Sequence, residues 1–120
     1  MLTSLGKFLR KLRIDEGEIL KDMATKLNVT VSFLSAVENG KKRMPSVWNK
    51  QICELYRLTD EQRQAFTKSI AETEDSIEMN LNGLNSSSRE LAVSFARKFS
   101  DIDDEQIEAI KKILSGGKTN

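Results

Sequence analysis

The sequence of 120 residues contains no histidine and a single cysteine, Cys53. One cysteine cannot form a disulfide within the chain, and the usual zinc sites of Cys and His ligands cannot be assembled. Cys53 lies in a helical apolar pattern, so we expect a small core residue rather than a reactive thiol. With no glycine-rich phosphate loop either, the sequence predicts neither an enzyme nor a cofactor, and no metal site.

Long apolar runs are also missing. No run approaches the roughly 18 apolar residues that a membrane-spanning helix needs. The N-terminal segment MLTSLGKFLRKLR mixes apolar and basic residues and lacks the unbroken apolar core of a signal peptide. We therefore expect an amphipathic first helix, no membrane partner and a cytoplasmic location.

Proline occurs once, and apolar residues recur mostly at helical spacing, which predicts an all-α fold. Five helices, over residues 4–15, 19–27, 31–38, 46–56 and from 60 to about 70, are expected to form a first domain of residues 1–72. Two more, after residue 87 and from about residue 104, belong to residues 73–120. Asp103 and its acidic neighbours could suggest a cation site, but they are better explained as the start of the last helix.

Several capping and core assignments accompany these helices. Ser46 is expected to cap the fourth helix, with Val47 and Leu55 among its apolar residues. A Thr59–Gln62 capping box opens the fifth helix, whose inward residues would include Ala65. A Ser87–Glu90 capping box is expected to open the sixth. Trp48 is expected in the core.

Residues 77–81 alternate apolar and polar side chains, a pattern typical of a strand. A lone strand has no partner in a helical chain. The segment must therefore pair with a second copy of itself, lie against the helices, or not be a strand.

Residues 18–43 carry the most informative pattern, EILKDMATKLNVTVSFLSAVENGKKR. Ala24 is small enough for close helix packing, Asn28 tolerates a left-handed turn, and Thr30 can cap a following helix. Leu34 and Val37 then give that helix an inner face. This is the spacing of a helix-turn-helix, in which the second helix lies in the major groove of double-stranded DNA.

The charge distribution agrees with a DNA partner. Residues 1–70 contain 13 Lys and Arg against 8 Asp and Glu, whereas residues 71–120 contain 6 against 10. A basic first part suits a polyanion and an acidic second part does not.

Over about residues 5–70 the chain resembles the lambda-repressor-like (Cro/Xre) helix-turn-helix family. The resemblance is carried by Ala24 and by the runs KLNVT (26–30), LS (34–35) and ENGK (38–41). It implies a five-helix DNA-binding domain and a buried pair between Glu38 and Arg13. The wider sequence also looks like regulators of Gram-positive phages and mobile elements. Two positions depart from the family: Asn28 replaces a common turn glycine, and Leu20 replaces a common phosphate-binding Gln.

The resemblance also implies the DNA-contacting positions of the third helix. Its exposed residues, which would touch base edges, are Val31, Ser32, Ser35 and Ala36, and Asn39 could either reach a base or serve as a plain cap. Val31 and Ala36 can meet only apolar atoms, so we expect thymine methyls in the half-site, with further specificity from DNA shape. The expected phosphate contacts are Lys21, Thr30, Lys41, Lys42 and Arg43. Phe33 is expected to pack beside the turn rather than lie on the DNA backbone.

The C-terminal part has more apolar residues than a tail needs, and specific DNA binding normally uses two copies. We expect a homodimer, formed through Ile77, Met79, Leu81, Phe95, Phe99, Ile107, Ile110 and Leu114. The sequence thus predicts a transcriptional regulator, most simply a repressor on a palindromic operator. The alternative is an antitoxin or inhibitor whose C-terminal half binds a protein partner while the first domain regulates its own expression.

Overall fold

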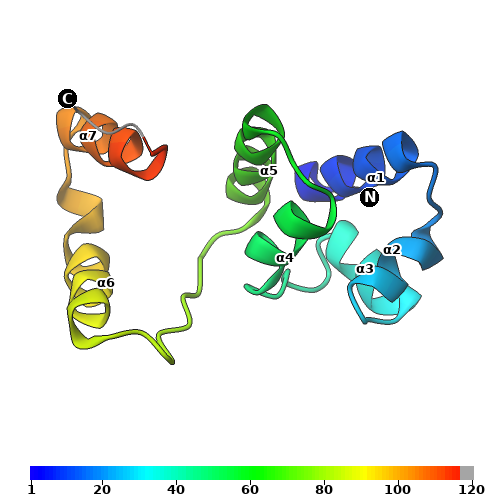
Figure 1. The fold of residues 1–120 in the computed structure, drawn as a ribbon, viewed down its shortest axis with the longest axis horizontal. Helices are drawn as coiled ribbons and strands as arrows, with labels where there is room; N and C mark the ends of the chain where they lie inside the picture. The colour runs from blue at the N-terminus through cyan, green and yellow to red at the C-terminus, as the bar shows by residue number, and fades with distance from the viewer. Residues whose placement is uncertain (117–120) are drawn as a thin grey trace. The chain divides into compact units, whose positions relative to one another are not determined.

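The computed structural model describes residues 1–116, and its regular elements are all helical (Figure 1). The chain divides into two compact units, one of residues 1–80 and one that begins at Leu81. The first unit contains five helices: α1 (Ser4–Glu16), α2 (Leu20–Lys26), α3 (Val31–Glu38), α4 (Trp48–Leu55) and α5 (Asp60–Thr73). The second contains α6 (Ser86–Lys98), the 3₁₀ turn η1 (Phe99–Asp101) and α7 (Asp104–Leu114). The predicted all-α class is therefore confirmed.

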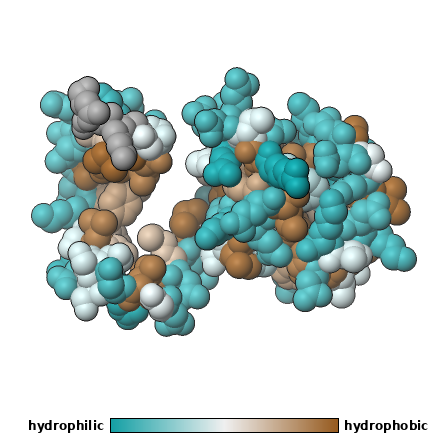
Figure 2. All heavy atoms as spheres, viewed as in Figure 1, coloured by the Kyte–Doolittle hydropathy of each residue, from teal (hydrophilic) through white to brown (hydrophobic). Residues whose placement is uncertain are grey.

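The core of the first unit is assembled around α1, which packs mainly against α5 and α3. Phe8 of α1 stacks on Phe66 of α5, with ring centroids 5.1 Å apart. Each fully buried apolar side chain contributes about 1.5–3 kcal/mol of transfer free energy to this core. The buried apolar residues are Leu5, Leu9, Leu12, Met23, Ala24, Leu27, Leu34, Val37, Met44, Trp48, Ile52, Tyr56, Leu58, Phe66 and Ile70. Hydrophilic residues cover most of the face of this unit that Figure 2 shows.

The fourth helix begins later than predicted. The Trp48 amide donates to the Pro45 carbonyl at 3.0 Å, so Ser46 lies in a turn and its side chain does not cap α4. The inner face then consists of Trp48 and Ile52, one turn apart, followed by Tyr56. Of the other apolar residues expected in this helix, Val47 and Leu55 fall outside this stripe and are 65% and 41% exposed.

The fifth helix has the predicted Thr59–Gln62 capping box. Ala65, however, is exposed, because it lies about a quarter turn from the buried Phe66. Ser69 is buried instead, and its hydroxyl is satisfied by donating to the Phe66 carbonyl at 2.7 Å.

The second unit is helical but has no buried helical residue within its described part, residues 81–116. The side chain of Asn85 accepts from the Ser88 amide at 2.8 Å, so α6 is capped at Asn85 and the predicted Ser87–Glu90 capping box was wrong. Asp103 caps α7 and forms a capping box with Gln106. Figure 2 shows apolar residues on the visible surface of α7.

Residues 77–81 form no strand, and the regular elements of residues 1–116 are all helical. Ile77 and Met79 are about two-thirds exposed. Within residues 1–116, no helix is both long and apolar enough to cross a membrane.

Candidate nucleic-acid interface

The turn between α2 and α3 has the predicted geometry. Asn28 adopts the left-handed conformation with a φ of 57°. The Val29 amide then donates to the Ala24 carbonyl at 2.9 Å, which closes the turn around the end of α2. Ala24 is 2% exposed and Val29 packs against the core, so both apolar positions of the motif hold the two helices together.

The helix α3 begins with the predicted cap. The hydroxyl of Thr30 accepts from the Phe33 amide at 3.0 Å, and this bond satisfies one of the amides that a helix start leaves free. Leu34 and Val37 are buried, which confirms the inner face. Val31 and Ser32 are exposed on the other side.

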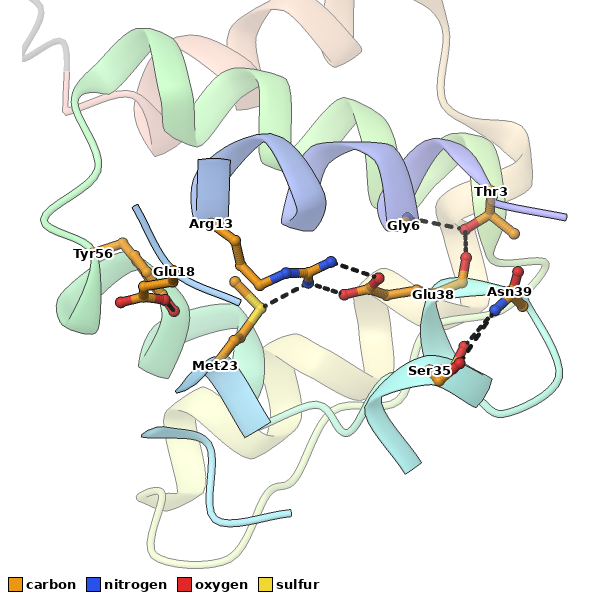
Figure 3. Close-up of polar contacts among 9 residues, drawn as sticks. All are labelled: Thr3, Gly6, Arg13, Glu18, Met23, Ser35, Glu38, Asn39 and Tyr56. Atoms are coloured by element: carbon orange, nitrogen blue, oxygen red, sulfur yellow. Dashed lines mark hydrogen bonds and ion pairs between the residues drawn. The ribbon is translucent and has the colours of Figure 1, made fainter. Parts of the chain in front are cut away.

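A buried ion pair fixes the C-terminal end of α3 against α1. Arg13 pairs with Glu38 through both terminal nitrogens of its guanidinium, and the Nη2–Oε1 distance is 3.2 Å (Figure 3). Nη1 of Arg13 also lies 3.5 Å from Sδ of Met23 on α2. Arg13 and Glu38 are 7% and 3% exposed, so this is the structural pair that the family resemblance implied. Through Arg13, Met23 and Glu38, this cluster connects α1, α2 and α3.

The backbone at Glu38 is held just as closely. Its carbonyl accepts from the Thr3 amide at 3.0 Å and from the Thr3 hydroxyl at 3.1 Å. Gly6 lies beneath the same carbonyl, and a Cβ at this position would be only 2.2 Å from the Glu38 oxygen. The close approach of α1 and α3 therefore requires glycine here.

Phe33 fixes the other side of α3. It is half-buried, and its ring meets Trp48 of α4 edge to face, with centroids 6.1 Å apart. Phe33 therefore packs within the protein, as expected, but its ring partner is Trp48 of α4.

The outer face of α3 forms one wall of an open hollow with a volume of about 390 Å³. All five predicted base-contacting residues line it, together with Leu20 and Lys41: Leu20, Val31, Ser32, Ser35, Ala36, Asn39 and Lys41. This lining, which lies wholly within the described residues, holds one cation and no carboxylate. Sequence reasoning treated Leu20 only as a departure from the family. Its place at the start of α2 brings it to the hollow.

The three lysines predicted to contact phosphate are exposed at the surface. Lys21, Lys41 and Lys42 are exposed and form no ion pair with any of residues 1–116. Lysines in this state can bind phosphate without first losing a protein partner.

Arg43 is placed differently from the three lysines. Its guanidinium donates to the hydroxyl of Ser76, and Nε lies 4.0 Å from the carboxylate of Glu74. Glu74 also accepts from the Met44 amide at 3.3 Å. These contacts attach the segment after α5 to the loop after α3, within the first compact unit of residues 1–80. A phosphate at Arg43 would have to compete with Glu74.

A second polar cluster ties α2 to α4. The hydroxyl of Tyr56 donates to Glu18 at 2.7 Å, Glu18 pairs with Lys26, and the Lys26 ammonium lies 4.8 Å from the centre of the Tyr56 ring. Burial, and then the hydrogen bond to Glu18, raise the pKa of the Tyr56 phenol well above its ordinary value. The sequence offered no signal for this cluster, since its members lie in three separate segments.

Comparison with known sequences and structures identifies the motif. Residues 4–66, just over half of the chain, match the sequence profile of a family described as a helix-turn-helix domain. No curated protein and no solved structure matches the chain. The matched residues contain α2, the turn at Asn28 and α3, and also Arg13 of α1, which pairs with Glu38. The chain therefore belongs to this helix-turn-helix family.

Proposed function

We propose that the protein is a sequence-specific transcriptional regulator that inserts α3 into the major groove of DNA. The observation that carries this proposal is the hollow on the outer face of α3, which gathers the five candidate base-contacting residues and contains no carboxylate. In helix-turn-helix proteins the second helix of the motif reads base edges from such a position. Lys41 and Lys42 follow α3 after Asn39 and Gly40, and there they would contact the phosphates on either side of the contacted bases.

The regulator is proposed to act as a homodimeric repressor in the cytoplasm. A single domain covers only a few base pairs, and a two-fold dimer would place two copies of α3 on half-sites about one helical turn apart. The exposed apolar residues of the second unit supply a surface for the second copy, with Phe95, Phe99 and Leu114 39%, 58% and 79% exposed. Such a dimer would recognise a palindromic operator and repress by covering a promoter. An origin among phage or mobile-element regulators of the Cro/Xre type belongs to the same proposal.

Selection of bound duplexes from a random pool tests the proposal. We expect a two-fold-related site with thymines at fixed positions of each half. The affinity for that site is then measured against salt concentration. Double substitution of Lys41 and Lys42 by Ala should lower the affinity for all duplexes alike and flatten the logarithmic salt slope by about 0.9 for each lost phosphate contact.

Two comparisons make this experiment decisive. Lys68→Ala removes an exposed lysine from α5 and should leave the salt slope unchanged, whereas Ser32→Ala should alter which sites are preferred. If no duplex is enriched and the chain is monomeric, the antitoxin or inhibitor alternative is favoured, because the apolar surface of α6 and α7 would then be free for another protein.

A further inference from the structure

The side chain of Asn39 at the end of α3 is held in one orientation. Its Nδ2 donates to the Ser35 carbonyl at 2.8 Å and lies 3.5 Å from the Ser35 hydroxyl oxygen (Figure 3). A backbone carbonyl can only accept a hydrogen bond, so the nitrogen end of the amide must be the end that faces Ser35. The oxygen end faces away from it.

The oxygen end of Asn39 is open to solvent. Oδ1 accepts no hydrogen bond from any of residues 1–116. In this part of the chain, every polar side-chain atom that lacks a partner is exposed to solvent rather than buried. Oδ1 is therefore accessible. Asn39 and Ser35 both line the hollow, so Asn39 offers the hollow a hydrogen-bond acceptor that is already oriented.

The bases differ sharply in what they can offer to such an acceptor. In the major groove only adenine N6 and cytosine N4 are donors, whereas the guanine and thymine edges present acceptors. Asparagine commonly reads adenine with both ends of its amide. Here Nδ2 is directed at Ser35, which leaves a contact through the oxygen alone.

We infer that Asn39 determines specificity by accepting a hydrogen bond from the exocyclic amino group of an adenine or cytosine in the half-site. The inference rests on the proposed function and adds to it the chemistry of one contacted base. Ser35 is the positioning residue, because its carbonyl fixes the amide before DNA arrives. A pre-oriented acceptor loses less side-chain entropy on binding than a free one.

Base analogues in the selected duplex test the inference. Purine nucleoside replaces each adenine in turn and 2-pyrimidinone replaces each cytosine, so that one amino group at a time is removed. At one position in each half-site we expect the affinity of the unmodified protein to fall about 5- to 10-fold, as for the loss of one hydrogen bond. The Asn39→Ala variant should lose no further affinity at that position, and the base replaced there tells adenine from cytosine.

Asn49 offers a matched control. Its Nδ2 also donates to a backbone carbonyl, that of Ser46, at 3.0 Å, but the residue lies on α4 and does not line the hollow. Asn49→Ala should retain the full sensitivity to amino-group removal. If Asn39→Ala is poorly folded, Asn39→Gly replaces it, since glycine is tolerated at helix C-termini.

The outcomes separate this inference from the proposal beneath it. If no duplex is enriched, the proposed function fails. If a site is enriched but the Asn39 variants remain as sensitive as the unmodified protein at every position, only the base contact is refuted.

Discussion

The rings of Phe33 on α3 and Trp48 on α4 pack edge to face at an interplanar angle of 86°. Trp48 is the only tryptophan of the chain and is 2% exposed. Its fluorescence therefore reports the folding of the first unit and, through the contact with Phe33, the packing of α3 against α4.

Removal of Glu38 should be far more damaging than removal of an exposed carboxylate. Glu38→Ala leaves Arg13 charged and buried without a partner, and we expect the free energy of unfolding to fall by about 3–5 kcal/mol. Urea unfolding followed by Trp48 fluorescence measures the loss. Glu54→Ala on α4 is the control, with an expected change within about 0.5 kcal/mol because Glu54 is exposed. Equal effects of the two substitutions would contradict a structural role for the pair.

Tyr56 should make the fold sensitive to alkali. The unfolded chain releases the phenol proton near the ordinary pKa of about 10, whereas the raised pKa in the folded state retains it. Since the unfolded state then binds fewer protons than the folded state, stability contributed by this group is present below about pH 10 and falls as the pH rises above it. Urea unfolding at several alkaline pH values should show this decline, and Tyr56→Phe should reduce it.

The same group can be observed directly. Tyr56 is the only tyrosine, so the ultraviolet absorbance of tyrosinate has a single source. We expect it to titrate above the ordinary value in the folded protein and at the ordinary value in urea. Titration at the same pH in both states would refute the bond to Glu18.

Glu74 should weaken the attraction of Arg43 for DNA. Glu74→Gln removes the competing charge but keeps an oxygen for the Met44 amide, so we expect binding to all duplexes to strengthen about 2-fold at low salt. Fluorescence anisotropy of labelled DNA measures the effect. Glu72→Gln removes an equal charge two residues earlier, at an exposed position of α5, and an identical gain there would mean that net charge alone is responsible.

The proposed dimer can be tested on α6. Phe95→Glu places a charge beside Phe99, whose ring lies 5.3 Å from that of Phe95, and should convert a dimer to a monomer. Light scattering after gel filtration gives the mass. Ser94→Glu introduces the same charge at the neighbouring exposed position and should leave the dimer intact. A monomeric unmodified protein would exclude this arrangement.

The motif could be predicted from the sequence because its determinants are local. A small residue at 24, a residue at 28 that tolerates positive φ and a hydroxyl at 30 act within one or two turns of the chain, and the structure contains all three interactions. The Arg13–Glu38 pair, separated by 25 residues, was reached only through the family resemblance.

Other features depend on contacts that no local pattern encodes. The helix α4 begins at Trp48, which is buried, and not at the preceding Val47, which is exposed. Both side chains are apolar, so the apolar spacing of the sequence does not distinguish between them. The contacts of Arg43 with Ser76 and Glu74 span more than 30 residues, so the sequence by itself indicates only a basic loop. The hollow was also not predictable, because Leu20 reaches it from a different helix.

Gly6 sets a limit on how this scaffold can be altered. With the Glu38 carbonyl so near, even one added methyl group would push α1 off the end of α3 and tilt the surface that α3 presents. An engineer who wished to retarget the protein could replace the outward side chains of α3 freely, but would have to leave residue 6 untouched. A residue without a side chain, on a different helix, thus governs the direction in which α3 presents its outer face.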